Sequence, residues 1–234
     1  MKYERNKLYC FSPLVMIITF MAEMSMAVYT IMRYKMTEVT RLVVAMLVFL
    51  AIFQLAEYMV CEGSIIGDIT WSRLGYASIT MLPPLGIHMV YAIAKIKRRY
   101  MVWIAYMTAA LFAIFFLGVS GSLSGHECLG NYVIFQVASG LGGLFGAYYY
   151  LWLAVAVALA WFFARQSDSG AVRRSLMGMI LGYAAFIVPT ATANIISPDT
   201  IRGIPSIMCG FAGVLSITLI TLVLPGVAKP KERT

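Results

Sequence analysis

The sequence predicts an all-α membrane protein: a bundle of seven transmembrane helices, with the N-terminus outside, the C-terminus in the cytoplasm and a short extracellular strand or hairpin as a cap. The 234 residues are 61% hydrophobic and only 12% charged, whereas a soluble domain carries about 25% charged residues. The apolar residues also come in blocks of about twenty, the length of a helix that crosses about 30 Å of hydrocarbon. Transmembrane strands would instead show segments of about ten residues with alternating hydrophobicity.

Seven apolar blocks account for most of the chain. They cover residues 11–32, 42–60, 74–94, 101–119, 145–164, 175–196 and 204–225. The polar connections between them are short, so residues 1–234 are expected to form a single seven-helix transmembrane domain without an inserted soluble domain or an output module.

The basic residues predict the orientation. With the N-terminus outside, most of the 18 Lys and Arg residues fall in inner connections, as the positive-inside rule favours. The first block is interpreted as a helix rather than a signal peptide, because it is long, lacks a small-residue cleavage site and is followed by Arg33 and Lys35. We expect a multi-pass protein of the inner (plasma) membrane. The net charge of +8 then reflects cytoplasmic loops, and no nucleic-acid partner is expected.

Residues 120–146 are expected to cover the outer face. Residues 131–137 (NYVIFQV) are rich in β-branched and aromatic side chains, and residues 138–146 are rich in glycine. This pattern favours a short strand or hairpin. A re-entrant segment is the alternative, allowed only where protein or water covers its backbone.

The four cysteines all belong at or near the outer side on this topology, where an oxidising compartment permits disulfides. Cys61 and Cys128 both lie in loops and form the better pair. Cys10 and Cys209 lie nearer the hydrocarbon, where they form either a second pair or free buried thiols that act as small apolar residues.

Polar residues at the outer end of the second and third helices form the candidate ligand site. Gln54 and Glu57 are three residues apart and share one helix face, and Arg73 opens the next helix across a short loop. An ion pair between Glu57 and Arg73 either fixes the packing of the two helices or belongs to the binding site. Tyr76 and Asn194 are expected to line the same outward cavity, although an aromatic residue at this level also serves as an interfacial anchor.

Glu23 and His88 are candidates for a proton relay. Glu23 lies near the middle of the first helix, where a bare carboxylate is too costly unless it is protonated, paired or functional. His88 lies in the inner half of the third helix, and its alternative role is a hydrogen bond to a neighbouring helix. Pro83 and Pro84 are expected to kink that helix, because carbonyl groups near Thr80 lose their backbone donors.

The sequence argues against several enzymes. The two histidines, His88 and His126, belong near opposite faces, so a three-histidine zinc site like that of membrane ceramidases cannot be built. Residues 118–121 (GVSG) lack the late-helix histidine that a rhomboid protease needs, and the seventh helix lacks a lysine for a retinal Schiff base. There is no phosphate loop or dinucleotide fingerprint. We expect no enzymatic activity, no cofactor and no metal.

Residues 53–88 resemble the seven-helix sensor region at the N-terminus of some bacterial histidine kinases and diguanylate cyclases. The resemblance lies in a WSRLGY start, a proline-containing middle, a histidine towards the inner end and an LAEY-like end of the preceding helix. The residues concerned are Leu55, Ala56, Glu57, Tyr58, Trp71, Arg73, Leu74, Gly75, Tyr76, Pro83, Pro84 and His88. The resemblance implies a bacterial sensor. Sensors of that kind pass their signal to an attached output domain, and none is expected within residues 1–234. This chain is therefore expected to be a stand-alone version of the sensor region.

The sequence therefore predicts a receptor-like module that binds a small molecule in an outward pocket and acts through a separate signalling protein, with membrane lipid around it. The alternative is a small proton-coupled transporter, in which Glu23 and His88 handle protons and the proline kink permits rocking. An intramembrane enzyme is the least favoured class.

Overall fold

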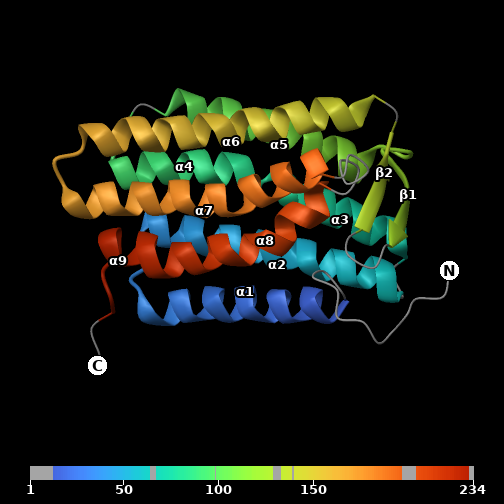
Figure 1. Cartoon of the computed structure of the whole chain (residues 1–234), viewed down its shortest axis with the longest axis horizontal. Coiled ribbons are helices and arrows are strands. Elements are labelled where there is room, and N and C mark those ends of the chain that lie inside the picture. The colour runs from blue at the N-terminus through green and yellow to red at the C-terminus, as the bar shows by residue number, and fades with distance from the viewer. Residues whose placement is uncertain are drawn as a thin grey trace.

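The computed structural model describes residues 13–63, 67–97, 99–128, 133–138, 140–196 and 204–231, without the side chains of residues 186, 193, 194 and 204–210. Long helices lie side by side along one axis, and a two-stranded sheet crosses one end (Figure 1). The elements in chain order are α1 (Pro13–Arg33), α2 (Glu38–Glu62), α3 (Asp68–Thr80), α4 (Leu82–Ala94), α5 (Tyr100–Gly118), β1 (Leu123–Cys128), β2 (Val133–Val137), α6 (Leu141–Gln166), α7 (Gly170–Ile196), α8 (Ile204–Thr218), the π-helical segment η2 (Leu219–Val223) and α9 (Leu224–Val227).

Six helical segments in the described part of the chain are long and apolar enough to cross a membrane. They are Pro13–Arg33, Glu38–Glu62, Asp68–Ala94, Tyr100–Gly118, Leu141–Gln166 and Gly170–Thr192. A shorter apolar helix covers Phe211–Val227. The prediction of a helical, multi-pass membrane protein is confirmed at this level, whereas the seventh span and the orientation stay predictions.

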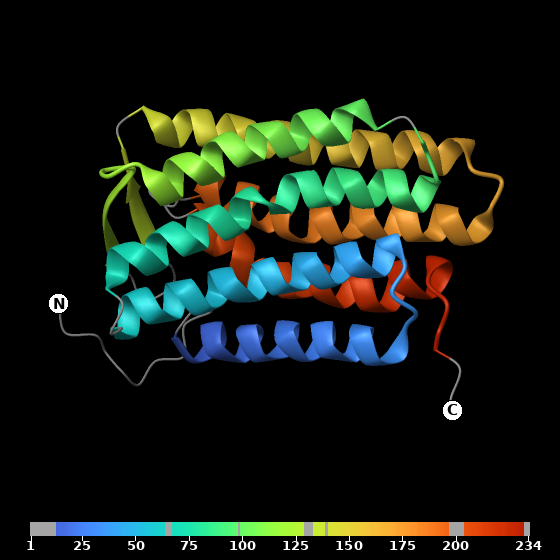
Figure 2. The ribbon, with the colours of Figure 1, turned by 180° about the vertical axis from the view of Figure 1, so that it is seen from behind.

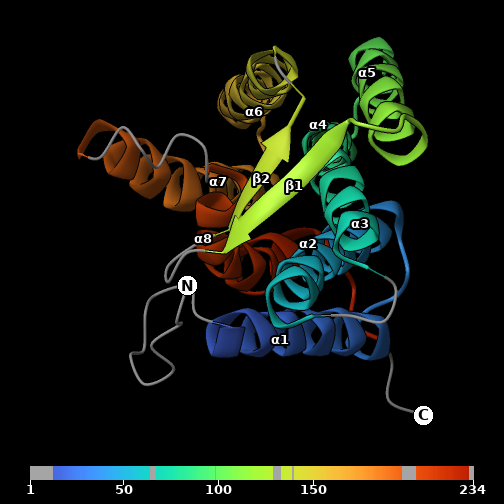
Figure 3. The same cartoon turned by 90° about the vertical axis from the view of Figure 1, so that its right-hand side faces the viewer.

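Two helices organise the bundle. α2 packs against α1, α3, α4 and α8, and α7 packs against α4, α6 and α8, as the end-on view in Figure 3 shows. By contrast, α5 exposes Trp103, Met107, Leu111 and Ile114, which are spaced so that they share one helix face. An apolar face of this size belongs in hydrocarbon rather than in water.

The two ends of the bundle differ. The β-hairpin lies at one end, which we call the hairpin end; the connections α1–α2, α4–α5 and α6–α7 lie at the other, the loop end, together with α9 (Figure 2). The strands β1 and β2 are antiparallel, with a register irregularity between Leu123 and Gly125. The predicted strand or hairpin within residues 120–146 is therefore confirmed.

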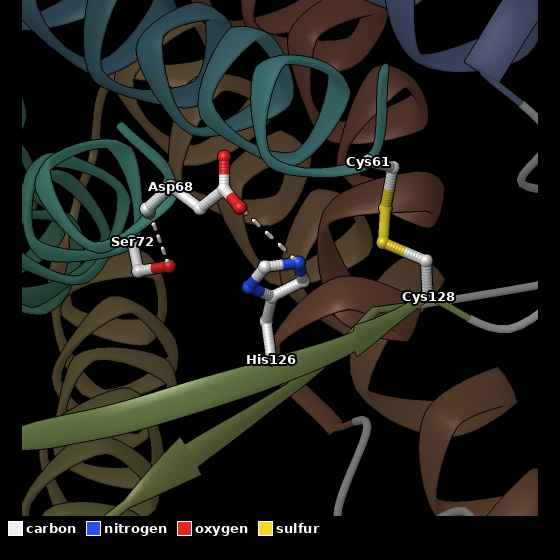
Figure 4. The surroundings of a disulfide bond; sticks show 5 residues. All are labelled: Cys61, Asp68, Ser72, His126 and Cys128. Carbon is white, nitrogen blue, oxygen red and sulfur yellow. Dashed lines mark hydrogen bonds and ion pairs between the residues drawn. A yellow bond between two sulfur atoms is a disulfide. The ribbon is translucent and has the colours of Figure 1, made fainter. Parts of the chain in front are cut away.

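A disulfide attaches the hairpin to α2. It joins Cys61, at the end of α2, to Cys128, at the end of β1, and the two Cα atoms are 5.8 Å apart (Figure 4). A bridge between residues this far apart in the chain restricts the unfolded state, which commonly contributes about 2–4 kcal/mol. Cys10 and the side chain of Cys209 lie outside the described residues, so the second predicted pair stays a prediction.

The expected kink in the third apolar block is a break at Met81. Pro83 and Pro84 occupy the first turn of α4, where a missing backbone donor costs least. The carbonyl oxygen of Thr80 would have received the N–H that Pro84 lacks, and it instead accepts a hydrogen bond from Tyr148 Oη on α6 (2.7 Å). A phenol from a neighbouring helix thus replaces the lost backbone donor.

Several helices extend beyond their predicted bounds. α2 begins at Glu38 rather than at 42, because Thr37 caps it: its hydroxyl accepts from the backbone N–H of Thr40 (3.4 Å). α3 begins at Asp68 rather than at 74, directly after Gly67, whose φ of 86° suits glycine. Hydropathy marks the hydrocarbon layer, whereas backbone hydrogen bonds continue a helix into its polar turns.

Candidate functional site

The predicted ligand residues of α2 and α3 lie under the hairpin, where these two helices approach closely. A Cβ at Gly75 would lie 3.1 Å from the Cβ of Ala56, so glycine is what lets the backbones come together here. Gln54 and Glu57 face the interior and are 2% and 1% exposed. The prediction that they share one face of α2 therefore holds, but they are buried within the bundle rather than on its surface.

Aromatic side chains from α5, α6 and β2 surround Tyr76 on α3. Its ring centroid lies 4.8 Å from that of Phe116 on α5 and 5.4 Å from that of Phe145 on α6. Phe135 of β2 lies 5.4 Å from Tyr76 and 6.0 Å from Phe53 of α2. Since Phe135 is only 4% exposed, the hairpin inserts a side chain into the bundle and closes this end of it.

The electrostatic character of the site comes from Glu57. Its carboxyl group lies within electrostatic reach of the Tyr76 phenol. A buried carboxyl group is normally hydrogen-bonded or paired, so Glu57 is a candidate contact for a cationic or donor group of a ligand. The amide of Gln54 adds two donors and an acceptor one helical turn away. Carboxylate, amide and aromatic faces together suit a small polar or cationic group.

Arg73 lies beside this cluster but contacts a different element. Its Nη2 donates to the carbonyl oxygen of Val119 (3.3 Å), the capping residue directly after α5. Its Nε has no hydrogen-bond partner among the described residues. An arginine at a helix C-terminus satisfies a carbonyl group that the helix leaves open. The ion pair between Glu57 and Arg73 stays a prediction. The side chain of Asn194, the fifth predicted ligand residue, lies outside the described residues.

A second contact, close to the disulfide, attaches the hairpin to α3. His126 Nε2 of β1 lies 3.9 Å from Asp68 Oδ2 at the start of α3, and Ser72 Oγ donates to the backbone carbonyl of Asp68 (2.9 Å) (Figure 4). Although Ser, His and Asp meet here, the serine is fully buried and its hydroxyl serves its own helix. The group anchors the hairpin, and a polar contact this exposed contributes about 1 kcal/mol or less.

His88 belongs to a polar cluster at the loop end, which we call the His88 cluster: Glu38, His88, Arg99 and Tyr106. His88 Nε2 lies 3.0 Å from Glu38 Oε1, and its Nδ1 lies 3.2 Å from Tyr106 Oη. Arg99 binds both carboxylate oxygens of Glu38, and this bond raises the pKa of Arg99. The cluster ties together the start of α2, the second half of α4 and the start of α5.

Sequence reasoning missed the partners of His88. The available signal was positional: Glu38 directly follows the Thr37 cap, and Arg99 directly precedes α5, so both belong at the loop end. Which helix starts lie next to α4 depends on the packing.

Glu23, the other relay candidate, has a different partner. Its Oε1 lies 3.3 Å from Ser216 Oγ on α8, and the side chain is fully buried. The contacts shown for His88 lead to α2 and α5 instead. The structure therefore assigns the two relay candidates to separate clusters.

Comparisons with protein-family models, with curated proteins and with solved structures give no match for this chain.

Proposed function

We propose that this chain is a receptor-like sensor of a bacterial inner membrane, which binds a small polar molecule under the hairpin and acts through a separate partner protein. The observation that carries the proposal is the burial of Gln54 and Glu57 beside Tyr76, at the end of the bundle that Phe135 of the hairpin closes. Polar groups buried inside a membrane bundle are costly, and they mark functional sites more often than chance.

The proposed topology has seven spans with the hairpin end outside. The six candidate spans are supplemented by α8, η2 and α9, which together cover Ile204–Val227. The loop end carries Arg33, Lys35, Arg41, Lys95 and Lys97, which the positive-inside rule assigns to the cytoplasm. A disulfide at the hairpin end agrees with an oxidising outer compartment.

The proposed signal runs along α2. This helix carries Gln54 and Glu57 near the hairpin end and Glu38 of the His88 cluster at the loop end. A ligand that reaches Glu57 would have to displace Phe135, and the hairpin would move with it. The break at Met81 would let α3 follow the hairpin while α4 keeps its contacts, and the His88 cluster would report the shift to a cytoplasmic partner. A ligand shifts such an equilibrium only by its difference in affinity for the two states.

The test is ligand-dependent thermal stability of the purified protein. A panel of small amines, amino acids and carboxylic acids is screened for compounds that raise the unfolding temperature. The stabilisation is expected to be lost in Glu57→Gln and Gln54→Leu and kept in Glu62→Gln, a matched control that removes an exposed carboxylate five residues further along α2. A compound that stabilises wild type and Glu57→Gln equally would place the ligand site elsewhere.

Proton-coupled transport is the second candidate function, and the fully buried Glu23 favours it. In that case a stabilising compound should also accumulate in proteoliposomes when a proton gradient is applied, and Glu23→Gln should abolish the uptake. A ligand that stabilises the protein without any flux supports the sensor over the transporter.

A further inference from the structure

The carboxyl group of Glu23 has no cation beside it among the described residues that would compensate a negative charge. It is fully buried in α1, on the face that also buries Met16, Ala27 and Thr30. Within the described residues, the contact that the structure shows for its carboxyl group is the one with Ser216, and Glu23 Oε2 has no hydrogen-bond partner. An ionised group in this position would have to bear its desolvation without a counter-charge.

In the described part of the chain, the helices that pack most against α1 supply no charge level with Glu23. They are α2 and α8. Residues 211–223, the described part of α8 together with η2, contain no ionisable side chain. Residues 42–53, the middle of α2, contain none either. The ionisable residues of α2 lie towards its ends: Glu38 and Arg41 at one, and Glu57, Tyr58 and Glu62 at the other. The surroundings of Glu23 therefore favour a neutral carboxylic acid.

Counting protons at Ser216 leads to the same conclusion. Its Oγ lies 3.3 Å from Glu23 Oε1 and 3.1 Å from the backbone carbonyl oxygen of Ala212. A serine hydroxyl has one proton to donate, so it can make only one full hydrogen bond as a donor at a time. If Glu23 Oε1 carries a proton, it donates to Ser216 Oγ, and Ser216 donates to Ala212; both contacts are then hydrogen bonds. With an ionised Glu23, the two acceptors would have to share the single proton of Ser216.

We propose that Glu23 and Ser216 form a proton-binding site in the interface between α1 and α8, in which Glu23 is the neutral acid and Ser216 positions it. The site adjoins η2, which begins three residues after Ser216, and π-helical turns are rare and frequently occur at functional sites. Loss of the proton would change Glu23 from a hydrogen-bond donor into an acceptor and would place a negative charge between the two helices. The protonation state therefore controls the packing of α1 against α8. This inference does not depend on the ligand site under the hairpin.

Infrared spectroscopy of the folded protein tests the proposal directly, because the carbonyl band of a carboxylic acid is separate from the bands of a carboxylate. The difference between wild type and Glu23→Gln at neutral pH should show the loss of an acid band. Glu62→Gln, which removes an exposed carboxylate, should show the loss of carboxylate bands instead. Loss of carboxylate bands in Glu23→Gln would overturn the proposal.

A second variant keeps the proposal testable if Glu23→Gln does not fold, and a second measurement checks it independently. Ser216→Ala should shift the acid band to higher frequency, because the acid loses its acceptor; an unshifted band would remove Ser216 from the site. The unfolding temperature of wild type should also fall relative to Glu23→Gln as the pH rises above neutral, since a group that holds its proton more tightly in the folded state loses stability with rising pH. Parallel pH profiles for the two proteins would contradict a neutral Glu23.

Discussion

Replacing Tyr148 with Phe tests how the bundle tolerates the proline break between α3 and α4. The hydroxyl of Tyr148 donates to the carbonyl oxygen of Thr80 at 2.7 Å, and Thr80 is fully buried. Pro84 cannot donate the backbone hydrogen bond that this carbonyl would receive in a continuous helix. Tyr148→Phe therefore removes one atom and leaves a buried acceptor without a donor.

The size of the effect follows from that loss. An unsatisfied buried acceptor costs about 1–3 kcal/mol in proteins generally. Hydrogen bonds between membrane helices average about 0.6 kcal/mol and reach about 1.7, because the unfolded chain in the membrane also finds partners. The Thr80 carbonyl has lost its own helical donor, so we expect a loss in the upper part of the membrane range, about 1–1.7 kcal/mol. The free energy of unfolding in detergent micelles measures it.

A second substitution makes the test specific to the proline. Pro84→Ala restores a backbone N–H that can donate to Thr80, because the next bond of the same ladder, from Leu85 N to Met81 O (3.3 Å), is already present. In this background Tyr148→Phe should cost much less. Equal losses in both backgrounds would refute the reasoning. Tyr29→Phe, which removes a hydroxyl from a side chain 48% exposed, should change the stability very little.

Three further predictions concern the hairpin, the orientation and the His88 cluster. Mass spectrometry of the oxidised, folded protein should find Cys61 linked to Cys128, and two free thiols would contradict the pairing. A cysteine introduced at Arg173 should react with an impermeant maleimide only from the cytoplasmic side, and one at Asp68 only from outside; the reverse pattern would invert the topology. Glu38→Gln should lower the free energy of unfolding by about 1 kcal/mol or less, because its carboxylate is 45% exposed; a loss of about 3–5 kcal/mol would mean that the ion pair is desolvated.

The elements that depend on local chemistry can be predicted from the amino-acid sequence. Apolar blocks of about twenty residues predict membrane helices because hydrocarbon cannot hydrogen-bond a bare backbone. The pair Pro83 and Pro84 predicts the break near Met81, since proline has no N–H to donate. The β-branched run before a glycine-rich stretch predicts the hairpin. The expected outer positions of Cys61 and Cys128 predict the pair that the structure joins, although Cys61 lies in the last turn of α2 and Cys128 at the end of β1 rather than in loops.

Which helix faces meet could not be predicted in this way, because it depends on the packing of the whole bundle. His88 and Glu38 are 50 residues apart in the chain, and Glu23 and Ser216 are 193 apart. Hydropathy cannot pair them, because apolar faces of membrane helices are nearly equivalent to one another and to lipid, so packing and a few polar contacts select the neighbours. The insertion of Phe135 between Phe53 and Tyr76 likewise depends on where the hairpin folds back, and the sequence of the hairpin carries no signal for that position.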